Sequence, residues 1–485
     1  MTFSEPVGNN AALPELIPLR VLFGSMNKSN PRVSPSGKLC GCIADAPNGV
    51  ANVFIKSIAF ASADNSSSGE AALVDTEAFQ FTWSKALAQP RLFFAVDDQG
   101  DENFHLHVAE FAFDEATNRV HDVHTRDLTP FKGCNVKLHS LVTSESHPDV
   151  VFVELNKRDP HKFDMCRIDL LTGEVAIDIE NPGSVANWLV NVDFHVWGCA
   201  AASDVDGSVS ICVRTSLKNT DAGSWRTIAV WPHGETADVY MFSKDASGLY
   251  VQTSISHGEG ATEVSDTTRL VLLSTVDGSE LQVIAHDPKC DVGSAEFSAN
   301  ACVPQFAVFN YTKPRVEVLD ESVRADVEHL EATCVGSFQR ISVSDDELTW
   351  LYADNRDDAS VKYFVFDRRS RRHVLLFDSR SALNQYQLAP MTSHVIQTSD
   401  GKGMIVYVSL PLGVQPNKLP FVVSVHGGPW YCDSWGLDTK HHLFVNRGYG
   451  CISVNFRGST GLGKRWGHLG DCEWGGKMQD NIAAQ

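Results

Sequence analysis

One pattern occupies most of the sequence, from about residue 30 to about residue 385. Short runs rich in β-branched and aromatic residues alternate with turns of glycine, serine and aspartate, and long helical periodicity is missing. A serine-rich turn followed by a hydrophobic run recurs at 34–39, 243–250 and 342–350. Four-stranded units that recur every ~40–50 residues are typical of a β-propeller. We therefore expect an all-β propeller of seven or eight blades over residues 31–385, after an N-terminal segment at 1–30. An array of two-sheet sandwiches is the alternative.

The pattern changes near residue 386. An apolar run at 419–425 predicts a buried strand, and a helix is expected over 437–447. A second buried strand is expected at 450–454, and another helix is expected to begin near Trp474. Alternating strands and helices open an α/β sheet. Residues 386–485 are therefore predicted to be the N-terminal part of an α/β domain that this sequence does not complete.

Charge and composition narrow the classes of partner. The net charge of −20 argues against nucleic acid and anionic membranes, because binding to phosphates requires a basic surface. No run approaches the ~20 apolar residues that span a bilayer, and residues 1–14 lack the features of a secretory signal. The twelve cysteines include no CxxC pair, which argues against a disulfide framework or a zinc site and favours a reducing compartment, the cytosol.

Three small clusters of polar residues are interpreted as structural. The basic cluster Arg368, Arg369, Arg371 and Arg372 is expected to be a solvated turn. The pairs His105/His107 and His441/His442 lack a third ligand at a suggestive spacing, so no metal is expected at either. No cofactor is expected elsewhere in the chain.

The strongest chemical signal is the segment His426-Gly427-Gly428-Pro429-Trp430, directly after the predicted strand at 419–425. Two glycines at the end of a strand let the backbone turn sharply and leave amide N–H groups facing a crevice. Such groups can stabilise the oxyanion of a tetrahedral intermediate, and the loss of one donor costs ~3–4 kcal/mol in known enzymes. The segment resembles the oxyanion loop of α/β-hydrolases. Residues 426–429 are therefore the candidate catalytic loop, and a plain strand-to-loop turn is the alternative.

Further segments resemble one family. The order HGGPW, NRGYG, NFRGSTGLG and EWGG, from residue 426 to residue 476, closely resembles the prolyl oligopeptidase family of serine peptidases. The likeness is nearest to the acylaminoacyl-peptidase and dipeptidyl-peptidase branches. Residues 97–104, 128–131 and 156–164 are similar to propeller segments of the same family, although Ser36 stands where an aspartate is common. The resemblance implies a β-propeller followed by an α/β-hydrolase domain.

The resemblance also implies which residues catalyse and which support. In the family, the catalytic serine lies in a G-x-S-x-G elbow, followed later by the aspartate and histidine of the triad. No G-x-S-x-G occurs here, and Ser459 does not lie in such a setting. We therefore expect the triad to lie beyond Gln485 and the chain to be inactive by itself. Asn455, Arg457 and Gly458 are expected to support the loop, and Arg457 could instead line the substrate pocket.

The function that the resemblance implies is hydrolysis of short peptides or acyl-peptides by acyl transfer through a serine. The acidic residues at 97–102 are interpreted as a hairpin cap, and binding of a substrate amine is the alternative. Whether the complete protein forms a homo-oligomer stays open. Two other functions stay open: a non-catalytic propeller that binds a peptide or protein, and an esterase on the same fold.

Overall fold

The computed structural model describes residues 14–46, 49–60, 71–72, 78, 80–85, 90–97, 100–114, 117, 119–216, 224–235, 237–258, 264–414 and 418–483. The predicted segment at 97–104 is therefore described only in part, because Asp98 and Gln99 lie outside these ranges. Residues 1–13 of the N-terminal segment also lie outside these ranges. No helix within the described ranges is long and apolar enough to cross a membrane.

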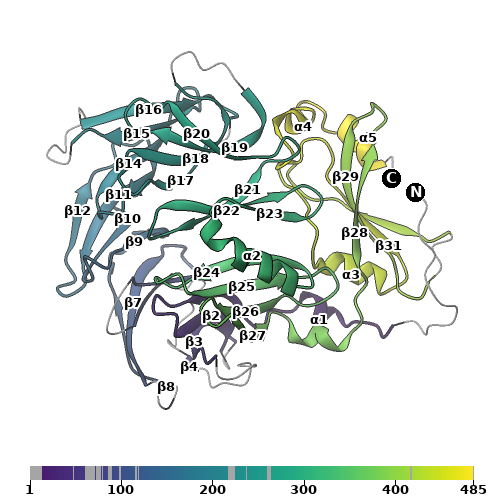
Figure 1. Cartoon of the computed structure of the whole chain (residues 1–485), viewed down its shortest axis with the longest axis horizontal. Coiled ribbons are helices and arrows are strands. Elements are labelled where there is room, and N and C mark those ends of the chain that lie inside the picture. Colours follow the sequence, from purple (N-terminus) through teal and green to yellow (C-terminus); the bar gives the residue numbers. More distant parts are fainter. Residues whose placement is uncertain are drawn as a thin grey trace.

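Seven antiparallel sheets precede β28 along the described chain, and the strands of each sheet follow one another in sequence (Figure 1). The first two sheets contain β1 (Ser29–Val33), β2 (Leu39–Asp45), β3 (Ala51–Ser57) and β4 (Ala71–Ala72), then β5 (Phe81–Trp83), β6 (Arg91–Val96), β7 (His105–Asp114) and β8 (Arg119–Asp127). The next two contain β9 (Val136–Thr143), β10 (Val150–Asp159), β11 (Lys162–Asp169) and β12 (Val175–Ile179), then β13 (Val185–Val190), β14 (Val196–Ala202), β15 (Val209–Arg214) and β16 (Trp225–Trp231).

The last three of these sheets follow the same plan. The fifth contains β17 (Ala237–Phe242), β18 (Gly248–Ile255), β19 (Val264–Ser274) and β20 (Glu280–His286). The sixth has three strands, β21 (Val292–Ser298), β22 (Val303–Asn310) and β23 (Pro314–Val318), and is followed by helix α2 (Glu321–Thr333). The seventh contains β24 (Ser337–Val343), β25 (Thr349–Asn355), β26 (Lys362–Asp367) and β27 (Arg372–Asp378).

Each sheet shares a hydrophobic core with the next one. Leu39 of the first sheet packs with Leu92 of the second, and Phe152 of the third packs with Trp188 of the fourth. The series closes on itself, because Val33 and Cys40 of the first sheet lie in one core with Leu351 of the seventh. Polar contacts join the same two sheets, since the Val33 amide donates to Ser342 Oγ at 3.0 Å. The apolar faces that a sheet cannot bury alone are thus buried between neighbours.

The predicted serine turns share one hydrogen-bonded form. Ser34 accepts from the Leu39 amide through its hydroxyl at 3.1 Å and donates its own amide to the Leu39 carbonyl at 2.8 Å. Ser243 does the same with Gly248, and Ser344 does the same with Thr349. Each turn joins the first and second strands of its sheet. The repeat predicted from the sequence is confirmed as a structural repeat.

The arginine cluster after β26 is more than a solvated turn. Arg368 Nε lies 2.8 Å from one carboxylate oxygen of Asp326 in α2, and Arg371 Nη1 lies 2.7 Å from the other. Both arginines also donate to carbonyl groups of α2, at Ser322 and Ala325. The prediction is therefore wrong for these two residues, because they fasten the helix to the seventh sheet.

The chain continues into a mixed sheet with the order β28-β29-β31-β30. Its strands are β28 (Met391–Gln397), β29 (Gly403–Ser409), β30 (Phe421–Ser424) and β31 (Gly450–Val454), and β30 pairs with β31 in parallel. Helix α3 (Thr439–Val445) packs on Cys451 at one face, whereas α4 (Lys464–His468) and α5 (Lys477–Ala483) pack on Val406 and Val454 at the other. The predicted strand, helix and strand are confirmed.

One part of that prediction is wrong. The strand expected to be buried at 419–425 is β30, which lies at the edge of the sheet. Phe421 is 40% exposed, Val423 37% and Val425 45%. Among the described residues, β31 is the strand that pairs with β30, so its outer edge and part of its apolar surface face solvent. Valine-rich composition indicates a strand but does not say what covers it.

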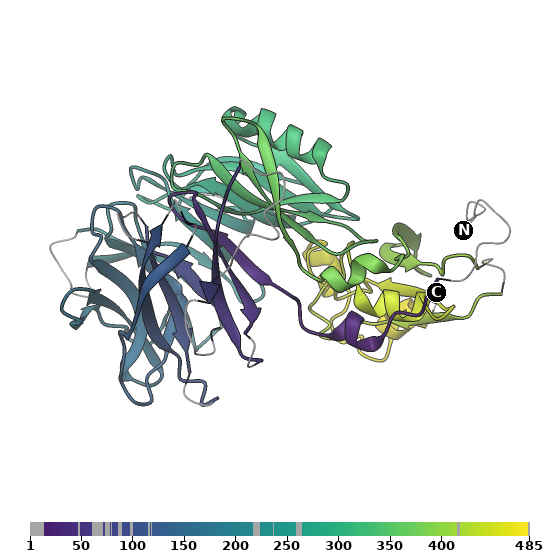
Figure 2. The ribbon, with the colours of Figure 1, turned by 90° about the horizontal axis from the view of Figure 1, so that it is seen from below.

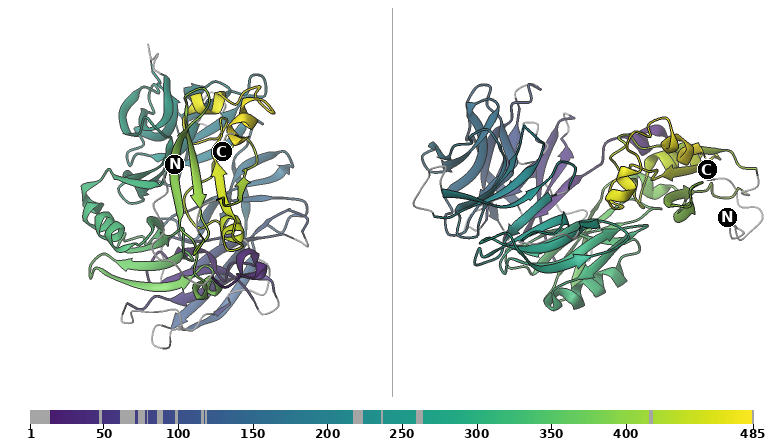
Figure 3. Two further views of the ribbon diagram at one scale, coloured as in Figure 1. Left: turned by 90° about the vertical axis from the view of Figure 1, so that its right-hand side faces the viewer. Right: turned by 90° about the horizontal axis from the view of Figure 1, so that it is seen from above.

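Residues 14–24 lie against the C-terminal sheet and away from the first sheet (Figure 2). Leu22 of α1 (Leu19–Phe23) lies in one core with Leu383, Leu437 and Leu443. The Ile17 amide donates to Asn446 Oδ1 at 2.7 Å. We call β28 to α5 together with α1 the C-terminal lobe, and β1 to β27 the β lobe; Figure 3 shows the two side by side.

Candidate active site

The candidate loop leaves the C-terminal end of β30 and is anchored by His426. The imidazole stacks on the Phe456 ring with centroids 4.6 Å apart and is 7% exposed as a residue. Its Nδ1 lies 2.9 Å from the Gly427 carbonyl oxygen, and its Nε2 lies 3.0 Å from Ser459 Oγ. Because a peptide C=O and the following N–H point in opposite directions, the Gly428 amide is directed away from the ring. His426 thus fixes the backbone of the loop.

The two glycines of the loop have different surroundings. No heavy atom lies within 4 Å of the place where a Cβ on Gly427 would be. Gly428 has a φ of +126°, and a Cβ there would lie 2.5 Å from the Trp430 nitrogen. Glycine at 428 is therefore required by the backbone, whereas the space at 427 is free.

The predicted supporting residues surround this loop. Asn455 is fully buried and exchanges two hydrogen bonds with the backbone of Asp433, accepting from its N–H at 2.8 Å and donating to its carbonyl at 2.9 Å. Arg457 is 2% exposed and donates to Asn481 Oδ1 at 2.9 Å and to Asp400 Oδ1 at 3.0 Å. Gly458 has a φ of +98°, a backbone conformation that favours glycine, and the place of a Cβ there lies in ordinary contact with Pro429 Cβ at 3.4 Å.

Ser459 and the two histidine pairs have structural contacts. Ser459 is fully buried and its hydroxyl lies 2.7 Å from the Phe456 carbonyl oxygen. His441 bridges Ser409 and Ser453 at 3.0 and 2.9 Å, and burial lowers its pKa to about 4. His442 Nε2 lies 3.0 Å from the Asp357 carbonyl, and His105 Nδ1 lies 2.9 Å from Asp127. In the part of the chain that the structure describes, no group of three or more His, Cys, Asp or Glu residues could hold a metal.

The loop borders a cavity between the lobes. This cavity has a volume of about 850 Å³, and its walls include Gly427 and Asp433 of the C-terminal lobe and Asn310 and Arg356 of the β lobe. Burial raises the pKa of the Asp433 carboxyl. Polar groups from both lobes thus face a space large enough for a small ligand.

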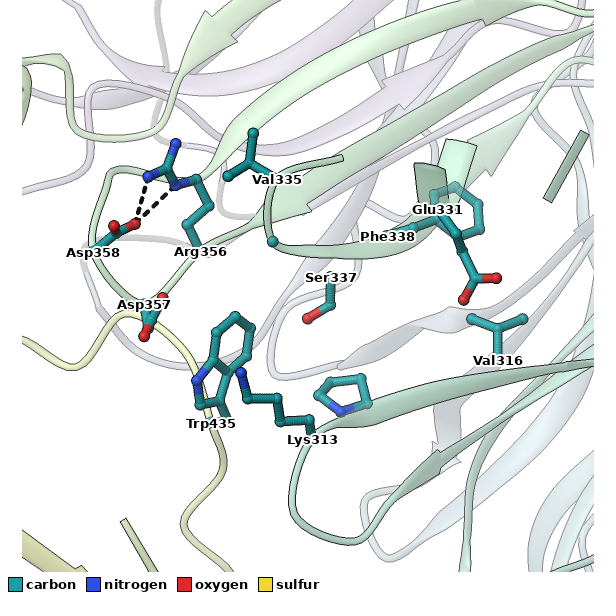
Figure 4. A pocket seen from close by; sticks show the side chains of 12 residues that line it. Lys313, Val316, Glu331, Val335, Ser337, Phe338, Arg356, Asp357, Asp358 and Trp435 are labelled. Carbon is teal, nitrogen blue, oxygen red and sulfur yellow. Dashed lines mark hydrogen bonds and ion pairs between the residues drawn. The ribbon is translucent and has the colours of Figure 1, made fainter. Parts of the chain in front are cut away.

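A second cavity of about 360 Å³ adjoins the first and is drawn in Figure 4. Trp435 lines both cavities, as do Phe338 and Arg356. Lys313 Nζ lies 4.2 Å from the centroid of a Trp435 ring, and Arg356 pairs with Asp358 at the rim. A cation over an aromatic ring is attracted by its π face. No pattern in the sequence pointed to Asp433, Arg356 or Trp435, because the loop and the β lobe meet only through the tertiary fold.

Comparison with known proteins identifies relatives over nearly the whole chain. No family model matches it. It is 29% identical over 475 residues to dipeptidyl aminopeptidase BIII of Pseudoxanthomonas mexicana, covering 96% of the chain and 65% of that protein. It is 24% identical over 500 residues to dipeptidyl peptidase family member 6 of Caenorhabditis elegans, covering 96% of the chain and 64% of that protein. The chain thus spans slightly less than two thirds of these relatives.

A solved structure shows the same fold. Prolyl oligopeptidase B of Galerina marginata, bound to a 25-residue macrocyclization substrate, matches with a TM-score of 0.65 at 10% identity. The match covers 96% of this chain and 66% of that one.

Proposed function

We propose that the chain belongs to the prolyl oligopeptidase family of serine peptidases, as its likeness to two dipeptidyl peptidases supports, and that the whole protein hydrolyses short peptides by acyl transfer to a serine that lies outside these 485 residues. One observation carries the proposal. The loop of Gly427 leaves the end of β30 and opens into the 850 Å³ cavity between the lobes, where a peptide carbonyl could meet its amides.

We infer that the β lobe is a seven-bladed β-propeller over residues 31–385, and that residues 386–485 begin an α/β-hydrolase domain. The closed series of shared cores, from the first sheet to the seventh and back, supports the propeller. The order β28-β29-β31-β30, with a parallel pair at its open edge, supports the hydrolase domain, because a further parallel strand can pair with β30.

We assign roles within the loop as follows. The amides of Gly427 and Gly428 are the candidate oxyanion donors, and His426 and Pro429 shape the backbone that carries them. Asn455, Arg457 and Gly458 are positioning residues, because their contacts hold the loop and the neighbouring segment at Asp433.

The substrate class follows from the enclosure of the site. A cavity between two lobes admits an extended peptide more readily than a folded protein, and the named relatives are dipeptidyl peptidases. Short peptides are therefore the proposed substrates; release of N-terminal dipeptides is the mode to test first, and acyl-peptides are the second mode.

A fluorophosphonate probe tests the proposal. The protein encoded by the full reading frame is expected to be labelled at a serine within a G-x-S-x-G segment, and Ser→Ala at that position is expected to abolish both labelling and peptide hydrolysis. The 485-residue chain is expected to remain unlabelled. Labelling of this chain at any of its own serines would refute the assignment, and cleavage of aryl esters without cleavage of peptides would favour an esterase.

A further inference from the structure

Two cysteines face each other across the centre of the fourth sheet. Cys199 of β14 and Cys212 of β15 are register partners in an antiparallel pair. Directly opposed residues in such a pair have Cα atoms about 4.5 or 5.5 Å apart, and disulfides form at Cα separations of about 4.4–6.8 Å. Either kind of antiparallel pairing therefore meets the distance requirement without movement of the backbone.

The two thiols also lie on one accessible face. Both line a cavity of about 600 Å³ whose walls include Trp188 and Trp225. Cys199 is buried at 5% exposure, whereas Cys212 is half-buried. Cys212 Sγ lies 3.5 Å from Thr227 Oγ1, its neighbour on β16. The Cys212 thiol is thus the more accessible of the two, and the Cys199 thiol beside it is buried.

The electrostatics of the pair favour one thiol as the nucleophile. The hydrogen bond between the two thiols lowers the pKa of Cys212 and raises the pKa of Cys199. The thiolate is the reactive form of cysteine, so the more exposed residue is also the more reactive one. Among the paired strands of the described chain, no other two cysteines are opposed.

We propose that Cys199 and Cys212 form a thiol–disulfide exchange site that is oxidised by small dialkyl disulfides. The Cys212 thiolate attacks one sulfur of the disulfide, its S–S bond breaks, and one thiolate leaves with the electron pair. Cys199 then loses its proton and attacks Cys212 Sγ, which expels the second thiolate. Two protein thiols are oxidised and one small disulfide is reduced to two thiols.

Oxidised glutathione is the probe, in a Cys472→Ser background that removes the exposed Cys472 thiol. Peptide mapping without reductant is expected to find residues 199 and 212 linked, and dithiothreitol is expected to restore both thiols. Cys199→Ala is expected to stop the reaction at a mixed disulfide on Cys212 and, because alanine donates no hydrogen bond, to move the pH midpoint of Cys212 alkylation up, toward the ordinary value of about 8.5.

Cys166 is the matched control, because it lies in the neighbouring sheet, is 1% exposed and has a pKa that burial raises to about 12. Cys212 is expected to react with glutathione disulfide at least about tenfold faster than Cys166. Equal rates at the two residues, or a mixed disulfide on Cys212 of the otherwise unchanged protein that never resolves to the linked form, would overturn the proposal. The mapping of that protein needs no variant at 199 or 212, so a folding defect in either cannot conceal the result.

Discussion

The adjacent glycines 427 and 428 look alike in the sequence but differ in what a methyl group would meet. The place of a Cβ on Gly427 is empty to 4 Å, and Gly427 lines the cavity between the lobes. Gly428 has a positive φ and a backbone nitrogen 2.5 Å from its Cβ position. One position therefore reports on the site, and the other reports on the integrity of the loop.

In the full-length enzyme, Gly427→Ala is expected to change the free energy of unfolding by less than about 0.5 kcal/mol. It is expected to lower kcat/KM by about tenfold or more, because the methyl group stands where the substrate carbonyl would approach the amides. Gly428→Ala is the control and is expected to cost about 1–3 kcal/mol of stability through backbone strain. Full activity in a stable Gly427→Ala enzyme would remove this residue from the proposed site.

At the scale of elements, local turns could be predicted and distant clamps could not. The serine turn at 34–39 closes over six residues, so both partners of its hydrogen bond lie in one short segment and the turn could be predicted from that segment alone. The clamp on α2 joins Asp326 to Arg368 and Arg371, more than forty positions away, and its partners depend on how the seventh sheet folds back. The opposed thiols of Cys199 and Cys212 likewise depend on strand register, which the sequence pattern alone does not fix.

Asp326→Asn is expected to lower the free energy of unfolding by about 1–3 kcal/mol, because two charge-assisted hydrogen bonds lose their charged acceptor. Chemical denaturation of the purified chain measures the change. Glu321→Gln on the same helix is the control: its pair with Arg324 is solvent-exposed, so a smaller loss of stability than that of Asp326→Asn is expected. Equal effects of the two substitutions would show that the clamp contributes no more than a surface pair.

At the scale of the whole molecule, the first and seventh sheets pack against each other, although they lie at opposite ends of the sequence of the β lobe. Gly37 has a φ of +73°, and a Cβ there would lie 2.6 Å from Thr349 Oγ1 of the seventh sheet. The predicted repeat indicated that such a closed arrangement exists. It did not indicate where β30 would lie, and that strand is exposed at the sheet edge.

Gly37→Ala is expected to destabilise the chain by about 1–3 kcal/mol more than Gly133→Ala, because only the first adds a clash between packed sheets. Gly133 has nearly the same φ, +72°, and no atom within 4 Å of its Cβ position, so the two variants share the backbone cost. Thermal and chemical denaturation give the difference. Equal losses in the two variants would mean that the closure tolerates an added methyl group.

The two connections between the lobes lie side by side, which determines how the lobes can move. The Asn27 amide, just before β1, donates to the Ser379 carbonyl just after β27 at 2.8 Å, and Arg380 Nη1 donates to the Gly24 carbonyl at 2.5 Å. At the far end of the C-terminal lobe, where Figure 1 places α4, Lys464 pairs with Glu235 at 2.9 Å. The lobes are thus joined covalently only along one edge, which can act as a hinge. At the opposite edge, breaking the ion pair between Lys464 and Glu235 would favour opening of the cavity between the lobes.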